Sequence, residues 1–224
     1  MSDDLPQPVH TGAAQTAAKV TVAGREALAL PLDAQAAACM DRWLSVATDP
    51  TRADTRLFAK LIAAREPRGE LALLGLARND WSALLARHFA HAPACALGLP
   101  FVAGSAIGVM ASEHIGFVRT LHALLLTHAS VTVDSNDAQC LATIIAHACL
   151  RPDHLWRDLG LAGRDEVTWM LTRYFPTLVA LNVANWRWKK FLAAQRALSL
   201  GLPPGPAPGC PGCEDYGHCF PECR

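Results

Sequence analysis

The sequence lacks an excess of charge of either sign. Its 224 residues include 20 Lys and Arg and 20 Asp and Glu, without a long run of one sign. Nucleic-acid binders usually carry a basic patch or stripe, so we expect no binding to nucleic acid. Residues 1–9 contain two acidic residues, no basic residue and no apolar core. We therefore expect no secretory signal peptide and a cytoplasmic protein.

Signatures of common enzyme classes are missing as well. The sequence contains no glycine-rich phosphate loop, no flavin or nicotinamide fingerprint, and no Ser/His/Asp or Cys/His set with hydrolytic spacing. The stretch from His88 to Ser112 has no charged residue, which raises the question of a membrane span. Proline, glycine and histidine interrupt this stretch, so we interpret it as a buried connection and expect no membrane association.

Strand signals are weak and confined to Val131-Thr132-Val133, whereas helical spacing of apolar residues is frequent from residue 32 onward. We predict that helices are capped by Asp33, Asp54 and Asn136, and that others begin at Asn79 or Asp80 and at Ser112 or Glu113. The helix after Ser112 has an apolar stripe of Ile115, Val118, Leu121, Leu124 and Leu125. A long final helix is predicted to include residues 182–191.

An internal repeat supports an all-α core. Residues 74–77 (Leu-Gly-Leu-Ala) match residues 159–162, and residues 78–89 match 164–175 after a single insertion at Gly163. Upstream, residues 59–63 match 142–146 in the same order. We predict a helical bundle of two related helix–turn–helix halves, at about 57–92 and 140–178. The predicted domains are a mobile leader (1–31), an all-helical domain (32–200) and a Cys-rich tail (201–224).

Four of the eight cysteines lie in the last fifteen residues, spaced C-x2-C-x5-C-x3-C: Cys210, Cys213, Cys219 and Cys223. The surrounding Gly, Pro and polar residues offer little apolar surface to bury, so metal binding is expected to order this segment. Four thiolates suit either zinc or an iron–sulfur cluster, and the spacing does not separate the two. Disulfides are less expected in a cytoplasmic chain.

Three residues outside the tail are further candidates. His154 offers an imidazole ligand beside Asp153 and Asp158, which would orient it, although a capping or core histidine is the simpler interpretation. Lys189 and Lys190 precede the tail and, together with Arg187, would offset the charge of an anionic cluster or an oxyanion, unless they form an ordinary solvated helix face. We assign Cys39, Cys95, Cys140 and Cys149, together with Trp186 and Trp188, to packing. His218 lies within the cysteine loop.

The second half also carries an ordered series of motifs. They are His-Leu-Trp-x-Asp-Leu-Gly-Leu at 154–161, Arg-x-Glu, Tyr-Phe-Pro, Trp-Lys-Lys-Phe at 188–191, and Cys-x2-Cys-x-Asp-Tyr-x2-Cys-Phe at 210–220. In this order they resemble the NifQ family, the molybdenum donors of nitrogenase cofactor assembly. The resemblance is closest from about Ala142 to the end and fainter from about Leu57 to Leu125.

The resemblance implies a function and a cofactor. Members of the family are thought to carry a molybdenum–iron–sulfur cluster and to pass molybdenum, taken up as molybdate or in processed form, to the scaffold of the nitrogenase iron–molybdenum cofactor, with the nitrogenase reductase taking part. Such a protein is a carrier in nitrogen fixation rather than an enzyme. The family's cysteine signature is Cys-x4-Cys-x2-Cys-x5-Cys, and its leading position falls on Gly205 here. A further family cysteine is matched by Ala197, while Cys223 is additional.

Two other classes of protein remain open at this point. One is a helical protein-interaction adaptor whose four cysteines form a structural zinc knuckle. The other is a redox enzyme that uses the cluster for electron transfer, which the absence of a flavin or nicotinamide signature disfavours.

Overall fold

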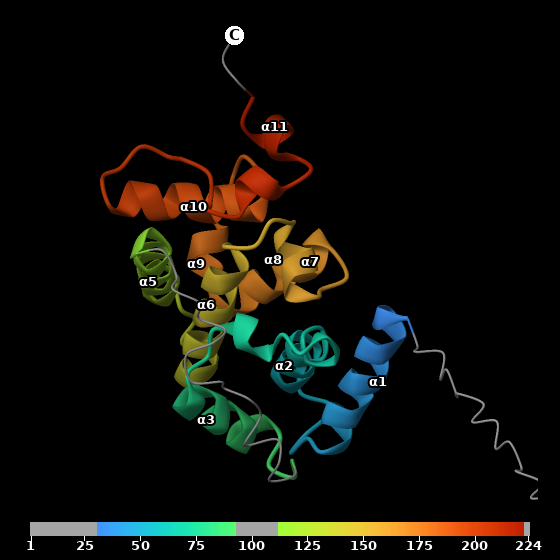
Figure 1. The fold of residues 1–224 in the computed structure, drawn as a ribbon. Coiled ribbons are helices and arrows are strands. Elements are labelled where there is room, and N and C mark those ends of the chain that lie inside the picture. Colours follow the sequence, from blue (N-terminus) through green and yellow to red (C-terminus); the bar gives the residue numbers. More distant parts are fainter. Residues whose placement is uncertain (1–30, 93–111, 222–224) are drawn as a thin grey trace, which may run out of the picture. The chain divides into compact units, whose positions relative to one another are not determined.

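The computed structural model describes residues 31–92 and 112–221, and within these ranges all regular structure is helical (Figure 1). The predicted all-α class is confirmed. The longer helices are α1 (Leu32–Ser45), α2 (Ala53–Ala63), α3 (Arg78–His88), α5 (Ser112–Thr127), α6 (Ser135–Ala148), α8 (Arg164–Tyr174) and α10 (Trp188–Ser199). The shorter ones are η1 (Glu66–Arg68), η2 (Leu71–Leu74), α7 (Leu155–Leu159), α9 (Pro176–Val179), η3 (Cys210–Gly212) and α11 (Tyr216–Cys219).

The two halves predicted from the repeat have the same order of main elements, with η1 as an additional short helix in the first. Each is preceded by a helix that the repeat did not include: α1 packs on α2 in the first half, and α5 packs on α6 in the second. A short helix then follows in each half, η2 or α7, and ends at a glycine with positive φ, Gly75 (73°) or Gly160 (70°). Such a conformation is strained for a residue with a side chain, which explains why glycine occurs at both turns. The next helix is α3 in one half and α8 in the other.

Each half contacts the other through equivalent positions. A Cβ atom added to Gly75 would lie 2.2 Å from the ring of His147, at the end of α6. One added to Gly160 would lie 2.0 Å from Cβ of Ala64, just after α2. Each glycine therefore lets its turn approach the helix of the opposite half. Arg65 and Arg151 follow these helices and donate to backbone carbonyls of the opposite turn, at Asp158 and Leu73 respectively.

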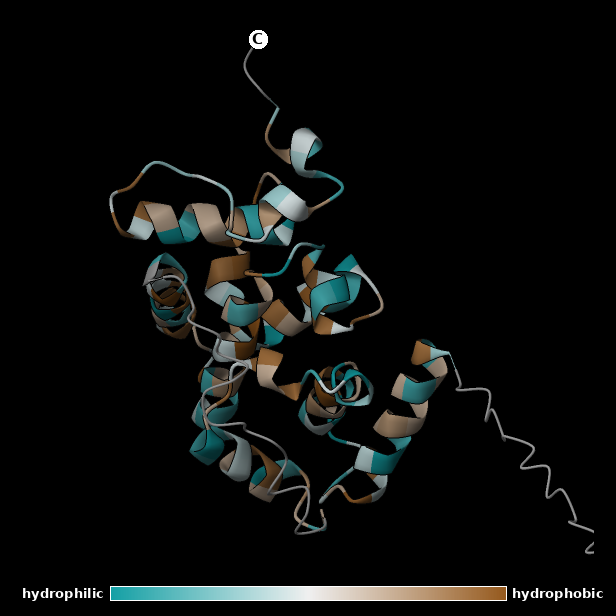
Figure 2. Ribbon diagram, in the orientation of Figure 1, coloured by the Kyte–Doolittle hydropathy of each residue, from teal (hydrophilic) through white to brown (hydrophobic). Residues whose placement is uncertain are grey.

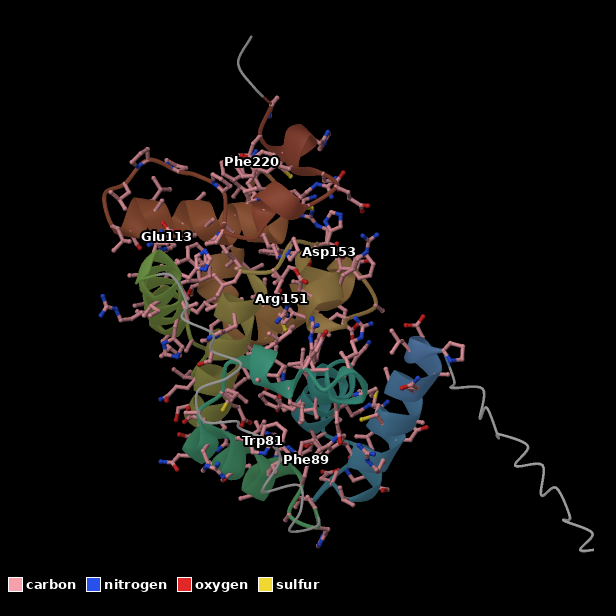
Figure 3. The ribbon with its side chains drawn as sticks, in the orientation of Figure 1. Trp81, Phe89, Glu113, Arg151, Asp153 and Phe220 are labelled. Carbon is pink, nitrogen blue, oxygen red and sulfur yellow. The ribbon has the colours of Figure 1, made fainter. Side chains whose placement is uncertain are left out.

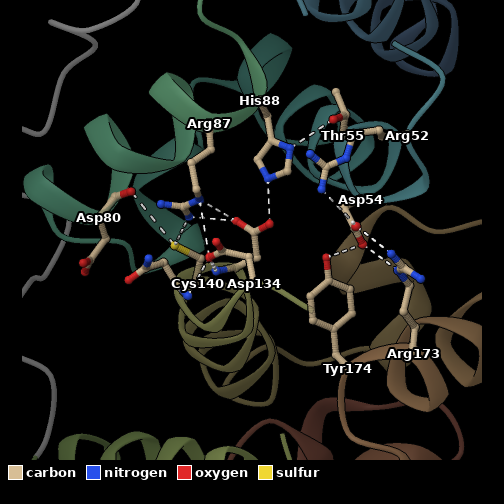
Figure 4. A network of polar contacts seen from close by, with 12 residues as sticks. Arg52, Asp54, Thr55, Asp80, Arg87, His88, Asp134, Cys140, Arg173 and Tyr174 are labelled. Atoms are coloured by element: carbon tan, nitrogen blue, oxygen red, sulfur yellow. Dashed lines mark hydrogen bonds and ion pairs between the residues drawn. The ribbon is translucent and has the colours of Figure 1, made fainter. Parts of the chain in front are cut away.

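A second pair of equivalent contacts connects the two halves. In each, an aspartate in the first turn of one helix contacts side chains at the end of a helix of the other half (Figure 4). Asp54, in the first turn of α2, accepts hydrogen bonds from Arg173 (2.6 Å) and from the Tyr174 hydroxyl (2.7 Å) at the end of α8. Asp137, in the first turn of α6, contacts Arg87 (2.8 Å) and His88 (2.9 Å) at the end of α3. Both carboxylates are buried, so these pairs satisfy charges that would otherwise be costly to bury.

Several predicted helix starts are wrong. Pro31 and Arg52 hold the N-cap positions of α1 and α2, so that Asp33 and Asp54 lie inside their helices. The cap of α6 is Asp134, whose carboxylate accepts from the backbone N–H groups of Asn136 and Asp137. The aspartates were plausible caps because their side chains accept such bonds, but Asp54 is engaged by Arg173 and Tyr174 instead.

The apolar stripes form one core that both halves share. α1 buries one face, at Cys39 and Trp43, whereas α2 and α6 are buried over most of their residues. Figure 2 shows apolar residues along all three helices. The largest buried side chains of the core include Trp81, Phe89 and Tyr174, the first two labelled in Figure 3. Leu121 and Leu125 are buried as predicted, whereas Ile115 is 53% exposed and does not belong to the stripe.

The prediction that four cysteines and two tryptophans pack in the core is confirmed in part. Cys39, Cys140 and Cys149 are buried, which confirms their assignment, and Cys95 lies outside the described residues. Trp188 is buried, but Trp186 is 40% exposed.

Other expectations are corrected or fall on residues that the structure does not describe. The last long helix begins at Trp188 rather than at residue 182, because the chain turns at Asn182–Asn185. Residues 131–133 form a turn and not a strand. The predicted leader, except Pro31, and most of the predicted buried connection lie outside the described residues. Within the described ranges, every helix is too short or too polar to cross a bilayer.

The cysteine tail packs on the helical body, which differs from the expectation that it has nothing to bury. Ala207 and Cys210 belong to the hydrophobic core, and the Gly209 N–H donates to the carbonyl of Cys149 (3.1 Å). Added Cβ atoms at Gly209 and Gly212 would lie 1.9 Å and 2.4 Å from atoms of Arg151 and Pro152. The two glycines therefore allow the tail to lie directly against the turn between α6 and α7.

Candidate metal centre

The described cysteines of the tail line one cavity, which contains about 600 Å³ of empty space, part of it open to solvent. Its walls come from the α6–α7 turn, the start of α8, the start of α10 and the tail. All six described residues that the sequence singled out for the site line it: His154, Lys189, Lys190, Cys210, Cys213 and Cys219. Figure 3 labels Asp153 and Phe220, which line the cavity from the turn and from the tail. Cys223 lies outside the described residues.

The backbone of the tail positions the three thiols. Cys210 opens η3, and the N–H of Cys213 donates to its carbonyl (2.9 Å), so the Cys-x2-Cys element forms one tight turn. Cys219 ends α11, where its N–H donates to the carbonyl of Asp215 (2.9 Å). Two turns of the chain, held by their own hydrogen bonds, thus present thiols to a common space.

The three thiols differ in their surroundings. Cys210 is buried, and Cys213 and Cys219 are half-buried. Burial raises the pKa of the Cys210 thiol, which the nearby Lys189 ammonium partly opposes. A raised pKa favours the protonated form of this thiol at neutral pH. All the described cysteines, those of the tail included, are free thiols, with no disulfide among them.

His154 occupies the N-cap position of α7, and its imidazole points to the tail. Nε2 lies 3.0 Å from a carboxylate oxygen of Asp215 and 3.4 Å from one of Glu214. Asp153 was expected to orient the ring, but its carboxylate accepts from the backbone N–H of His154 (2.7 Å). Asp158, the other expected partner, pairs with Lys189. The orienting carboxylates are therefore those of the tail.

One group of three potential ligands in the described part of the chain lies close enough to hold a single ion. It consists of His154, Glu214 and Asp215, whose ligand atoms all lie within 4.8 Å of one another. The three cysteines line the same cavity but do not form such a group. Arg157 and Arg187 pair with Glu214 (2.9 Å) and Asp215 (2.7 Å), so both carboxylates are already neutralised.

The two lysines hold different positions. Lys189 is buried, and its ammonium pairs with Asp158 and donates to the carbonyl of Arg151 (2.7 Å). Lys190 donates to the carbonyl of Cys219 (2.6 Å) and lies about 5 Å from the ring centroids of Trp186 and Phe220. Lys189 thus fixes the α6–α7 turn against α10, while Lys190 holds the end of the cysteine loop.

Sequence reasoning named Arg187 as a basic residue near the site but missed its partner and the other residues that join the tail to the body. Arg187 pairs with Asp215, Arg157 pairs with Glu214, and Arg164 lines the cavity from the start of α8. The adjacent pair Glu214-Asp215 between two cysteines was the available signal, because acidic residues inside a predicted ligand loop need basic or imidazole partners nearby.

This geometry can be set beside known proteins. The profile of the NifQ family matches residues 56–221, which is more than half of the chain and includes every described site residue. This chain belongs to the NifQ family.

Curated relatives agree with this assignment over a shorter region. A NifQ homolog of Sinorhizobium fredii is 42% identical over 100 residues, which cover 45% of this chain and 43% of the relative. NifQ of Azotobacter vinelandii is 41% identical over 87 residues, 39% of this chain and 45% of the relative. NifQ of Klebsiella pneumoniae is 44% identical over 85 residues, 38% and 51% respectively. The chain thus spans about half the length of the curated relatives it matches. No solved structure matches it.

Proposed function

We propose that this NifQ protein carries a molybdenum–iron–sulfur cluster and donates molybdenum during assembly of the nitrogenase iron–molybdenum cofactor. Its partners would be the cofactor scaffold and the nitrogenase reductase, in the cytoplasm, and its cargo would originate from molybdate. Family membership supports the role in nitrogenase cofactor synthesis. The observation that carries the finer proposal is the single cavity that three thiols, His154 and two lysines line together.

The arrangement of the thiols favours a cluster over a mononuclear zinc site. A structural zinc ion requires four ligand atoms within about 2.3 Å of one point. Cys210, Cys213 and Cys219 share a cavity but are not gathered about one point as His154, Glu214 and Asp215 are. A cluster suits this spread, because each of its metal corners takes its own thiolate.

Each residue has a distinct part in this proposal. The thiolates hold the iron atoms, since soft sulfur ligands suit iron–sulfur units. His154, held by the tail carboxylates, faces the molybdenum corner, where an exchangeable ligand permits release. Lys189 and Lys190 offset the negative charge that thiolates and sulfides bring to the cavity. Cys223 supplies the fourth thiolate that the family signature expects at the position of Gly205.

Cysteine variants, reconstituted with iron and sulfide under strict anaerobiosis, test the ligand set. We expect Cys213→Ser and Cys223→Ser each to lower iron per chain at least twofold, because each removes one thiolate of the set. The double variant Gly205→Cys with Cys223→Ser should regain the lost iron. Cys140→Ser is the matched control, since Cys140 is buried beside Arg87, outside the cavity, and should keep full iron.

Three results would contradict the proposal at different levels. Full iron in Cys223→Ser would remove that residue from the ligand set and leave three cysteines to hold the cluster. Full iron in Cys213→Ser would show that the Cys-x2-Cys element does not hold the cluster. Stoichiometric zinc without iron in the unaltered protein would reject the cluster carrier in favour of an adaptor with a zinc knuckle.

A further inference from the structure

A second pocket adjoins the metal cavity and shares Arg164, Arg187, Lys190 and Cys219 with it. Besides Cys219, it is lined by Arg164, Asn185, Trp186, Arg187, Lys190 and His218. Three of these side chains are cationic, and none of the lining residues is acidic. The metal cavity has the same three cations and, in addition, Lys189, Asp153 and Asp215. The second pocket is therefore lined by cations without a carboxylate among its lining residues.

Two of its cations have only neutral partners among the described residues. Arg164 donates to the carbonyls of Asn185 (3.0 Å) and Trp186 (2.9 Å) and to the Asn185 side chain. Lys190 donates to the carbonyl of Cys219 and faces the Trp186 ring. Carbonyls and rings orient a cation without cancelling its charge. A guanidinium and an ammonium therefore retain their full attraction for an anion.

The loop that forms the pocket wall has a constrained conformation. Asn185 has a φ of 51°, the one positive value at a non-glycine residue in the described part of the chain. The loop closes through Asn182, whose side chain accepts from the Trp186 N–H (2.9 Å) and donates to the Trp186 carbonyl (3.0 Å). Backbone strain of this kind persists where surrounding contacts hold it and is frequent at ligand sites. Arg164 and Asn182 together hold the loop in this shape.

We propose that this pocket binds a small tetrahedral oxyanion in its free form. Arg164 and Lys190 contribute the charge-assisted hydrogen bonds, and Arg187 adds positive potential although it is paired with Asp215. Because Cys219 lines both spaces, an oxyanion held here lies next to a thiol of the metal cavity. The identification of the oxyanion as molybdate rests on the proposed function, whereas anion binding by the pocket does not.

Calorimetric titration of the full-length protein, prepared without metal, tests this directly. Molybdate, sulfate and phosphate are titrated separately at low ionic strength, because surface charge interactions are screened by salt. We expect Arg164→Gln and Lys190→Gln each to raise the dissociation constant at least tenfold. Lys190→Gln leaves the bonds of the Asn182–Trp186 loop in place, so its effect is separate from any loss of loop structure. Arg119→Gln, which changes an exposed arginine of α5 outside the pocket, should stay within twofold.

The same titration with Cys219→Ser separates anion binding from reaction with a thiol. Retained binding supports the pocket, and lost binding would assign the affinity to the thiolate and overturn the proposal. Equal losses in Arg119→Gln and Lys190→Gln would show unspecific attraction and also overturn it, as would affinity for an acidic peptide but for none of the three oxyanions. Molybdate affinity at least tenfold above that of sulfate and phosphate supports molybdate as the ligand. Similar affinities support an oxyanion pocket without that link.

Discussion

At the scale of single residues, His154 is the candidate whose role depends most on its surroundings. Its imidazole lies beside Glu214 and Asp215 at the edge of the thiol cavity. In the proposed cluster, thiolates would suffice for iron, whereas the imidazole would complete or release the molybdenum corner. We therefore expect His154→Gln to retain iron and to lower bound or transferable molybdenum at least severalfold, measured as both metals per chain and as molybdenum passed to an acceptor protein.

A matched control uses a histidine outside the cavity. His128 lies after α5 and hydrogen-bonds Thr177 (2.8 Å), so His128→Gln should leave both metals unchanged. If folded His154→Gln also keeps both metals and transfers molybdenum normally, His154 only supports the α7 turn and the assignment fails.

The sequence was informative about which residues form the site and less so about their partners. The Cys-x2-Cys spacing and the basic pair before the tail led to residues that share one cavity. Asp158 was expected beside His154 because it is close in sequence, yet it pairs with Lys189 of α10. The burial of Lys189 and the approach of Glu214 to Arg157 depend on contacts between segments distant in sequence, which local spacing does not encode.

At the scale of elements, Asp54 and Asp137 connect the two halves through reciprocal polar contacts. Replacing either carboxylate with an amide removes its charge-assisted hydrogen bonds while the arginine remains. We expect Asp54→Asn and Asp137→Asn each to lower the free energy of unfolding by about 2 kcal/mol at pH 7. Urea denaturation measures this, and Asp41→Asn on the exposed face of α1 is the control, with a change within about 0.5 kcal/mol.

The contribution of the Asp54 carboxylate to the free energy of unfolding should decrease as the pH falls below about 4. The Arg173 guanidinium, helped by the Tyr174 hydroxyl, lowers the pKa of the Asp54 carboxyl below its usual value. A group whose pKa is lowered by folding stabilises the protein above its unfolded pKa of about 3.9 and loses this contribution as pH falls through the folded value. The difference between Asp54→Asn and the unaltered protein should therefore be constant from pH 7 to 5 and shrink below about pH 4. A difference that grows on acidification would contradict this account.

The repeat in the sequence predicted the pairing of elements better than their ends. Gly75 and Gly160 identified equivalent turns, because both positions need positive φ and a close approach. The capping positions were harder to predict. Asp54 has the residue type of a cap, but contacts with α8 determine its role, and Pro31 and Arg52 occupy N-cap positions without a side-chain cap. Tertiary contacts thus overrode local preference at these helix starts.

At the scale of the whole molecule, the tail and the body share one core. Ala207 and Cys210 are buried with the body, and Gly209 and Gly212 lie directly against the α6–α7 turn. Composition suggested a segment ordered by metal alone, because Pro and Gly give little apolar surface to bury. Residue composition alone does not show that a glycine, which has no Cβ, allows the backbone of the tail to approach the body closely. Contacts with the body therefore help to position the segment that contains Cys210 and Cys213.

The metal content of the intact protein tests the central claim most directly. Iron, molybdenum and acid-labile sulfide per chain are measured after strictly anaerobic purification, together with the electron paramagnetic resonance spectrum of the protein as isolated. A molybdenum–iron–sulfur carrier predicts all three elements in fixed ratio, a cluster signal, and loss of both in Cys213→Ser. Stoichiometric zinc with neither sulfide nor molybdenum would contradict it.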